Sequence, residues 1–332
     1  MKGISIIVCC YNSAKRLEAT LTHIAAQKIT ALINCELVLV NNLSTDDTEA
    51  AAEQIWLTLN SPFMLRIVNE QNPGLSNARK RGVTEAMFDY LIFCDDDNWL
   101  EAHFISTSFA IMDSDERIGI LGGKIAAVYE KEPEPWLLEQ SEYLAIGPLQ
   151  EIADGDITNH YGIVFGAGMV LRKKLFADLN ELSYRFLLSD RKGNLLTSCG
   201  DTELCFCARL LGYKIFFSNQ LHLHHFIPVQ RMTVAYFKRL MFGLGYSSIH
   251  LLPYIYALQQ TKIKGIEKFK ITWYWQALST IKAMIVLKFA SLGSSQQLQL
   301  QYAQKKGRLK ALLTIRSAYQ LSFKQVAILN EK

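Results

Sequence analysis

The sequence predicts an α/β fold, with a Rossmann-like, mostly parallel sheet flanked by helices and a basic helical extension at the C-terminal end. Short apolar runs alternate with helical segments up to the residues around Leu100, which is typical of parallel strands joined by right-handed crossovers. From Thr233 onward the strand pattern fades, and apolar and aromatic residues alternate with lysines. We therefore expect two domains, 1–228 and 229–332.

Each predicted element has a local signal. Four apolar runs have the length of buried strands: 4–10, 36–40, 64–68 and 90–94. Helices are expected between them, over 14–27 with Ser13 as N-cap, then up to residue 59 and up to residue 86. Further on we expect a helix ending at residue 112, strands at 118–121, 124–129 and 213–218, and a helix at 201–211.

Charge is distributed unevenly along the chain. Residues 1–228 hold 19 Lys and Arg against 29 Asp and Glu, which is a net charge of −10. Residues 229–332 hold 16 Lys and Arg against 2 Asp and Glu, which is a net charge of +14. The net charge of the whole chain, +4, hides this difference. Lys282 and Lys288 interrupt the most apolar stretch, 273–292, which favours a basic amphipathic region on an anionic membrane surface over a transmembrane helix. The alternative is an ordinary helical subdomain with a solvated basic face. Nucleic-acid binding is not expected, because no recognisable module accompanies the charge.

The cysteines and the first residues of the chain indicate the cellular compartment in which the protein is expected. Seven cysteines, an odd number, lie mostly in apolar runs and are interpreted as buried thiols in a reducing environment. Lys2 leads directly into the first strand, without the pattern of a secretory signal. We expect a cytoplasmic protein, peripheral on the inner face of the cell membrane.

The strongest chemical signal is the junction at residues 90–99. An apolar run ends in Asp95, Asp96 and Asp97, and ligands of open α/β sheets bind beyond the carboxyl ends of such strands. Three adjacent carboxylates need a cation, and oxygen ligands favour Mg²⁺ or Mn²⁺ shared with phosphates. For these three residues alone, an acidic surface turn is an equal alternative.

Six motifs in order over more than 200 residues, with a further segment after them, decide between these interpretations. They are residues 4–12, 40–46 (VNNLSTD), 69–82 (NEQNPGLSNARKRG), 95–97 (DDD), 166–169 (GAGM) and 200–204 (GDTEL), followed by 225–233 (HFIPVQRMT). Together they resemble the family 2 glycosyltransferases with a GT-A fold, of the bacterial polysaccharide type. Asn41 and Asn42 stand where that family often has aspartates, and Gly200 replaces the first acid of its catalytic motif.

The resemblance implies a role for each matched residue. It implies that Asp201 is the catalytic base, that Asp97 and His225 hold a divalent metal, and that Arg79 and Arg231 approach the phosphates. It further implies a nucleotide-sugar site that also includes Tyr11, Asn12, Asn41, Asn42, Asp95, Asp96, Gly166, Ala167, Gly168 and Glu203.

The expected function follows from this set. A divalent ion on the diphosphate stabilises the leaving group, and a carboxylate removes the proton of the attacking hydroxyl. We expect an inverting, metal-dependent glycosyltransferase with a nucleotide-sugar donor and a glycan acceptor carried by a lipid. A nucleotidyltransferase or dehydrogenase is disfavoured, because residues 10–14 lack the glycine-rich loop. The remaining alternative is a catalytically degenerate nucleotide-sugar-binding protein of the same fold.

Overall fold

The computed structural model describes residues 1–29, 33–148, 150–190, 196–259, 265–290 and 295–330. The chain forms two compact units: unit 1 comprises Met1–Glu181 and Gly212–Val229, and unit 2 comprises Leu182–Leu211 and Gln230–Lys332. The segment Leu182–Leu211 is thus grouped with the C-terminal helices. The division into functional domains at residue 228 stays a prediction.

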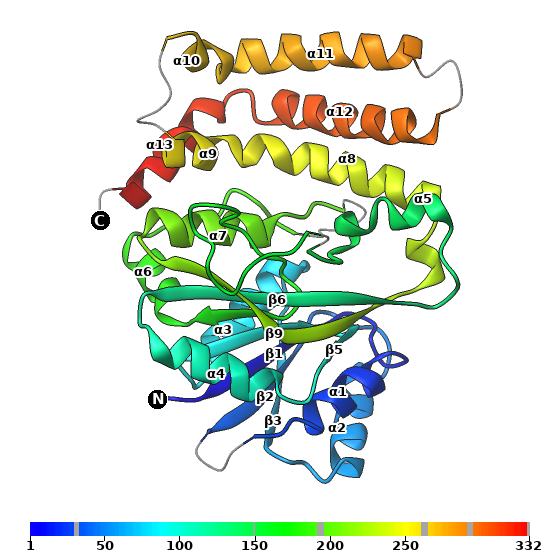
Figure 1. Ribbon diagram of the computed structural model, residues 1–332, viewed down its shortest axis with the longest axis vertical. Coiled ribbons are helices and arrows are strands. Elements are labelled where there is room, and N and C mark those ends of the chain that lie inside the picture. The colour runs from blue at the N-terminus through cyan, green and yellow to red at the C-terminus, as the bar shows by residue number, and fades with distance from the viewer. Residues whose placement is uncertain (30–32, 149, 191–195, 260–264, 291–294, 331–332) are drawn as a thin grey trace. The chain divides into compact units, whose positions relative to one another are not determined.

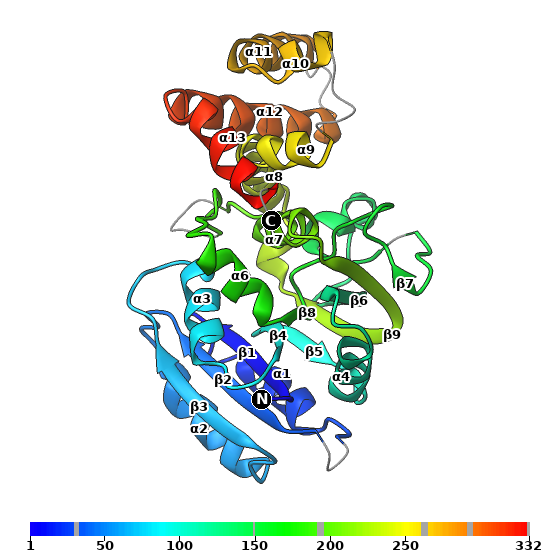
Figure 2. The same ribbon diagram turned by 90° about the vertical axis from the view of Figure 1, so that its left-hand side faces the viewer.

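Unit 1 is built around one mixed sheet. Its strands are β1 (Ile4–Cys10), β2 (Cys35–Asn41), β3 (Met64–Asn69), β4 (Tyr90–Asp95), β5 (Asn98–Leu100), β6 (Ile118–Tyr129), β7 (Gly155–Asp156), β8 (Met169–Arg172) and β9 (Lys214–Ile227). They lie in the order β3-β2-β1-β4-β8-β6-β9-β5, with β7 beside β9; Figures 1 and 2 together label these strands. Its helices are α1 (Leu17–Ala25), α2 (Thr48–Thr58), α3 (Leu75–Glu85), α4 (Phe104–Ser114), α5 (Pro135–Leu138), η1 (Ser141–Leu144) and α6 (Lys174–Glu181).

The parallel half of the sheet positions the site. Strands β3, β2, β1 and β4 pair in parallel and lie side by side in Figure 2. The chain runs from β1 to β2 on one side and returns to β4 on the other, so a topological switch point lies at the carboxyl end of β1. Nearly every residue of β1, β2 and β4 is buried, as expected of parallel strands covered on both faces. The predicted α/β fold is confirmed.

Three local predictions were wrong. The first helix begins at Leu17 rather than at residue 14, because the Ser13 carbonyl accepts the Arg16 and Leu17 amides in a turn and the Ser13 hydroxyl is used elsewhere. Strands 118–121 and 124–129 are one strand, β6, because Gly122 and Gly123 allow Val164 and Leu221 to approach closely rather than break the strand. The strand predicted at 213–218 continues to Ile227.

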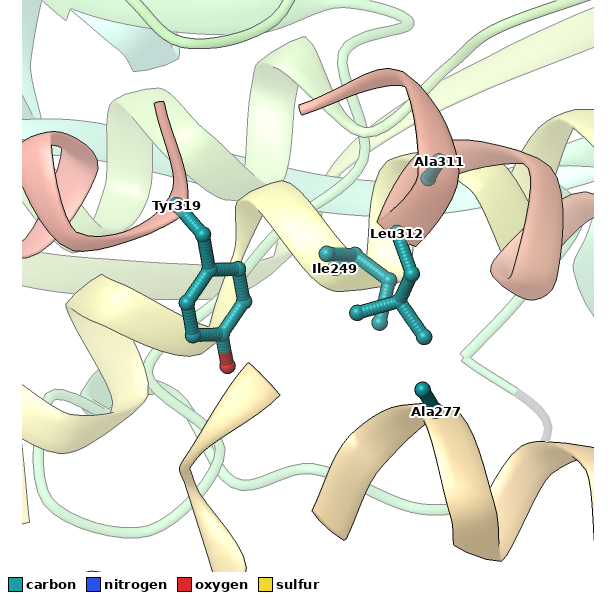
Figure 3. Packing of buried hydrophobic residues seen from close by; sticks show 5 residues of the cluster. All are labelled: Ile249, Ala277, Ala311, Leu312 and Tyr319. Atoms are coloured by element: carbon teal, nitrogen blue, oxygen red, sulfur yellow. The ribbon is translucent and has the colours of Figure 1, made fainter. Parts of the chain in front are cut away.

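Unit 2 is helical. Its elements are α7 (Gly200–Leu210), α8 (Val234–His250), α9 (Leu252–Gln259), α10 (Ile266–Lys270), α11 (Trp273–Ala290), α12 (Gln296–Thr314), α13 (Tyr319–Ala327) and η4 (Ile328–Asn330), and η2 (Val229–Arg231) precedes α8. Ile249, Ala277, Ala311, Leu312 and Tyr319 form a core between α8, α11, α12 and α13 (Figure 3). The predicted helical C-terminal region is confirmed.

Two glycines set the spacing between α8 and α12. A Cβ on Gly245 would collide with the Gln304 carbonyl, and one on Gly307 would collide with the Phe242 carbonyl. The backbones of these helices therefore approach closely only because both positions lack side chains. Among the described residues, no helix is long and apolar enough to cross a membrane.

Candidate active site

A two-residue turn between β4 and β5 carries the acidic cluster. Asp96 and Asp97 occupy the turn, and Asn98 stabilises it from the first position of β5. The Asn98 side chain accepts the Asp95 amide at 3.1 Å and donates to Asp97 Oδ1 at 3.3 Å. Asn98 is fully buried, so the conformation of the turn is fixed from inside the protein.

Pairing of β5 with β9 brings His225 to Asp97. His225 lies opposite Asn98 in the antiparallel register, and the Phe226 amide donates to the Asp97 carbonyl at 2.9 Å. His225 Nε2 lies 3.5 Å from Asp97 Oδ1, with both side chains more than nine-tenths buried. The two residues predicted to hold a metal are therefore together.

Asp96 is held by the turn that follows β1. Arg16 Nη2 lies 2.6 Å from Asp96 Oδ2, and the Ser13 hydroxyl donates to the same oxygen. Burial raises the pKa of Asp96, and its bond to Arg16 opposes that shift. Arg16 was not predicted as a site residue, since a single basic residue at a helix start has no distinctive sequence signal.

Arg79 extends from α3 to the other side of the acidic cluster. Its guanidinium lies 3.3 Å from Asp95 Oδ1 and 5.0 Å above the Phe93 ring. Phe93 and Asp95 both belong to β4. The structure thus brings Arg79 and Asp95 together, as expected if both face one anionic ligand and its counter-ion.

The β1 turn is tied to the loop that follows β2. Asn12 adopts a positive φ of 52°, its amide donates to Ser44 Oγ at 3.0 Å, and its Oδ1 accepts the Thr45 amide at 2.8 Å. Tyr11 beside it is exposed. The Asn12 side chain therefore shapes the turn, while the Tyr11 ring faces solvent.

The side chains of Asn41, the last residue of β2, and of Asn42, which follows it, form hydrogen bonds within the protein. Asn41 donates to Glu49 Oε1 at 2.5 Å and to Asn69 Oδ1 at 3.1 Å. Asn42 donates to the Glu70 and Asn72 carbonyls at 2.9 and 2.8 Å, and accepts the Gly74 amide at 2.8 Å. An aspartate at 42 would turn a carboxylate toward two carbonyl oxygens. This is a physical reason for the departure from aspartate there.

The glycine-rich segment before β8 is packed inside unit 1. Gly166, Ala167 and Gly168 are all buried. Gly168 has a φ of 66°, and a Cβ there would collide with the Leu223 side chain. Packing against β9 therefore explains by itself why residue 168 is glycine. The expected contact of this segment with a sugar stays a prediction.

In unit 2, Asp201 lies in the first turn of α7. Its Oδ1 accepts the Thr202 amide at 2.7 Å. The preceding residue, Gly200, donates its amide to both carboxylate oxygens of Asp190 at 3.1 Å, and a Cβ on Gly200 would collide with Asp190 Oδ2. Asp190 therefore caps the helix that carries Asp201, and it occupies the space that a side chain at 200 would need.

Glu203 is buried in the same helix. Its carboxylate accepts the Leu187 and Leu188 amides at 2.5 and 3.1 Å and the Tyr254 hydroxyl. Tyr254 also lies 2.5 Å from the Tyr184 hydroxyl. Burial raises the pKa of Glu203 to about 8, although these three donors favour its charged form. Its contacts join α7 to α9, and its expected role at the sugar stays a prediction.

Arg231 ends η2 and is partly exposed. Asp201, Glu203 and Arg231 belong to unit 2, whereas all the other predicted site residues belong to unit 1. Sequence reasoning missed Arg16 and Asp190, because each contacts a residue of another segment, Asp96 and Gly200 respectively. It also missed Asn98, whose contacts with Asp95 and Asp97 depend on the conformation of the turn.

The side chains at the acidic turn indicate what kind of metal ion could bind there. Within the described residues, no group of three or more His, Cys, Asp or Glu is gathered to hold an ion. Asp97 and His225 offer one carboxylate and one imidazole, which suit Mn²⁺. Ions bound by one or two protein groups are completed by phosphate oxygens and water. The pair therefore fits a cation that is shared with a bound diphosphate.

A mixed α/β sheet with an acidic turn at its switch point, followed by helices, defines a protein of the GT-A fold. The sequence model of the family described as "Glycosyl transferase family 2" matches residues 5–179. That match covers more than half of the chain, and the chain belongs to this family.

Curated relatives match part of the chain. A cholesterol galactosyltransferase of Borreliella burgdorferi is 29% identical over 106 residues, which are 32% of this chain and 28% of the relative. A poly-beta-1,6-N-acetyl-D-glucosamine synthase of Staphylococcus aureus is 29% identical over 97 residues, 29% of this chain and 22% of the relative. The matched region thus spans less than a third of each relative.

Solved structures share the fold over nearly the whole chain. TarS 1–349 of S. aureus in complex with UDP-GlcNAc has a TM-score of 0.51 at 16% identity, covering 97% of this chain and 92% of that one. The mannosyltransferase PcManGT from Pyrobaculum calidifontis in complex with GDP-Man and Mn²⁺ has a TM-score of 0.53 at 17% identity, covering 98% and 84%. At this identity the likeness concerns the fold alone.

Proposed function

We propose that the protein is an inverting, metal-dependent glycosyltransferase that moves a sugar from a nucleoside diphosphate donor to a glycan acceptor. The observation that carries the proposal is the Asp97–His225 pair at the switch point of a family 2 sheet. Asp95, which pairs with Arg79, and Asp96, which pairs with Arg16, lie on the same β4–β5 segment. This combination of carboxylates, imidazole and guanidinium suits a diphosphate and its cation.

The donor site is proposed from the ends of β1, β2 and β4. Tyr11 offers an exposed ring for a base, and Arg79 offers positive charge for phosphate oxygens. The amides of Asn41 and Asn42 are used within the protein, so we place base recognition at Tyr11 and the surrounding backbone. UDP-GlcNAc and GDP-Man, named with the two solved relatives, are the first donors to test.

The metal is proposed to bind at Asp97 and His225. A bound divalent ion would supply positive charge to the diphosphate leaving group. The chain's own contribution is to hold the two ligands: Asn98 donates to Asp97, and the β5–β9 pairing fixes His225.

Asp201 is proposed as the base that takes the acceptor proton. Its carboxylate lies in the first turn of α7, where the helix dipole stabilises negative charge. The Asp190 cap and the Glu203 contacts hold this helix turn in place. A carboxylate that acts on the face opposite the leaving group would give inversion at the anomeric carbon.

For the acceptor we propose a surface glycan carried by a lipid, extended at the inner face of the cell membrane. One matched relative is named for a lipid acceptor, cholesterol, and the other for a polysaccharide product. The region 229–332, with its net charge of +14, suits a membrane location.

Release of nucleoside diphosphate tests the proposal. A panel of UDP- and GDP-sugars is incubated with the protein, Mn²⁺ and lipid extracts or oligosaccharides, and the product is analysed by NMR for its anomeric configuration. Turnover with inversion supports the proposal, and retention of configuration contradicts it. Tight donor binding without turnover on any acceptor would instead favour the degenerate binding protein.

A further inference from the structure

Helix α11 has an apolar face that no described part of the chain covers. One side of the helix packs on α12 through Gln276, Ala277 and Thr280, which are buried. In Figures 1 and 2, α12 lies between α8 and α11, and α11 is the outermost of the three. The opposite side of α11 therefore faces away from the rest of unit 2.

This outer side is a continuous apolar stripe. At 3.6 residues per turn, the spacing i, i+4, i+7, i+11, i+15 places five residues on one line. They are Tyr274, Leu278, Ile281, Ile285 and Phe289, each between 42% and 70% exposed. A surface helix normally shows charged or polar residues there. An exposed apolar stripe of this length marks an interaction site.

Helix α10 adds to the same surface. Ile266 and Phe269 are exposed, and the Phe269 ring lies 5.5 Å from the Trp275 ring in an edge contact. A hollow of about 750 Å³ lies beside the stripe, lined by side chains of α11 and α12 that include Val286, Lys282 and Lys305. We call these parts of α10, α11 and α12 the α11 surface.

The positive charge around the α11 surface indicates which kind of partner binds there. Lys268 and Lys270 flank the α11 surface on α10, and Lys282 and Lys288 lie on α11 itself. Residues 229–332 contain only two acidic residues, Glu267 and Glu331, and Glu267 is paired with Lys270 at 2.6 Å. Self-association through this stripe would bring two strongly positive regions together, with Lys288 next to the stripe in both copies. A bilayer with anionic headgroups offers both apolar depth and negative charge.

We propose that the α11 surface docks on an anionic lipid bilayer, with the stripe inserted at the level of the headgroups and the lysines on lipid phosphates. The proposal goes beyond the sugar transfer described above and does not depend on it. It specifies which face of residues 229–332 binds lipid: the outer side of α10 and α11 with the adjoining hollow, rather than α8 or α13.

Vesicle binding with a matched pair of variants tests the proposal. The full-length protein is mixed with vesicles of phosphatidylglycerol and phosphatidylcholine at low salt, and the bound fraction is measured by sedimentation. Leu278→Glu should lower the partition coefficient about tenfold or more. The control is Leu57→Glu on α2, because Leu57 is 67% exposed and Leu278 is 65% exposed. Leu57→Glu should leave binding unchanged.

Two further measurements separate charge from apolar insertion. Reversing Lys268, Lys270 and Lys282 to Glu should weaken binding about fivefold or more per charge at low salt. Brominated lipids should quench the fluorescence of wild type, and the quenching should fall in Trp275→Phe. Pure phosphatidylcholine vesicles should bind much less protein.

Three outcomes would overturn the proposal. One is failure of wild type to bind anionic vesicles at low salt. Another is an equal loss of binding in Leu57→Glu and Leu278→Glu. The third is a dimer in solution that Leu278→Glu dissociates without any effect on vesicle binding, which would assign the stripe to a second copy. Activity on a water-soluble acceptor should be the same in Leu278→Glu and wild type, so failure of docking is distinguishable from failure of the proposed reaction.

Discussion

His225 Nε2 and Asp97 Oδ1 lie 3.5 Å apart, although the two residues are far apart in the sequence. The contact depends on the register of β5 against β9, in which His225 is opposite Asn98 and His224 is opposite Trp99. Successive residues of a strand point to opposite faces. His225 is accordingly buried beside Asp97, whereas His224 is partly exposed and lies 3.5 Å from Glu101.

His225→Ala should therefore weaken Mn²⁺ binding at least about tenfold when UDP or GDP is present, because the imidazole is one of two protein groups proposed to hold the ion. His224→Ala is the matched control and should bind as wild type does. Electron paramagnetic resonance titration of Mn²⁺ measures both. Equal affinity in His225→Ala and wild type would remove His225 from the metal site.

Asp201→Asn should lower kcat by about 10²–10⁴-fold while the donor affinity stays nearly the same, because the carboxylate is proposed to act on the acceptor proton only. Steady-state rates and donor titration by calorimetry give the two quantities. A variant that keeps most of its kcat would show that another group accepts the proton.

Gly200→Ala should destabilise unit 2, because the new methyl group would collide with the Asp190 carboxylate that caps α7. Asp190→Ala should cost about 1 kcal/mol through loss of the cap. In the double variant the collision disappears, so its cost should be smaller than the sum of the two single costs. Urea unfolding of the four proteins measures the coupling, and additive costs would contradict the close contact.

Asn42→Asp should cost about 2 kcal/mol or more, because it removes the buried amide that donates to the Glu70 and Asn72 carbonyls and places a charge beside those oxygens. The control is Asn77→Asp, since Asn77 makes one exposed bond to the Pro73 carbonyl at 3.1 Å. Thermal unfolding at neutral pH should show a clear loss for Asn42→Asp and little change for Asn77→Asp.

Glu203 should make the stability of unit 2 depend on pH. Its folded pKa of about 8 lies above the ordinary glutamate value of 4.5, so the folded state binds more protons than the unfolded state between these values. Its contribution is therefore fully present below the unfolded pKa and is lost as pH rises through the folded pKa. The free energy of unfolding, measured with urea, should fall over this interval in wild type, and the slope should be smaller in Glu203→Gln. An unchanged slope would mean that Glu203 is not the group responsible.

The parallel strands and the acidic turn were predictable from sequence. Strands buried on both faces are uniformly apolar, so β1, β2 and β4 are visible as short runs. The carboxylates of Asp95, Asp96 and Asp97 follow one of these runs directly, and the position of ligands beyond strand ends is a general property of such sheets.

The tertiary structure decided what each polar group contacts. The second half of β9 carries His222, His224 and His225 among apolar residues. Which of these histidines lies beside Asp97 is ambiguous until β5 and β6 are known to pair with β9. Arg16 acquires its relation to Asp96, and Asp190 its relation to Gly200, through folding alone. Likewise, the apolar and basic composition of residues 273–290 was evident in the sequence, but only packing on α12 determined which side of α11 is buried and which is left exposed. A local pattern specifies an element and its apolar positions, whereas the partner of a side chain depends on segments that only the folded chain brings together.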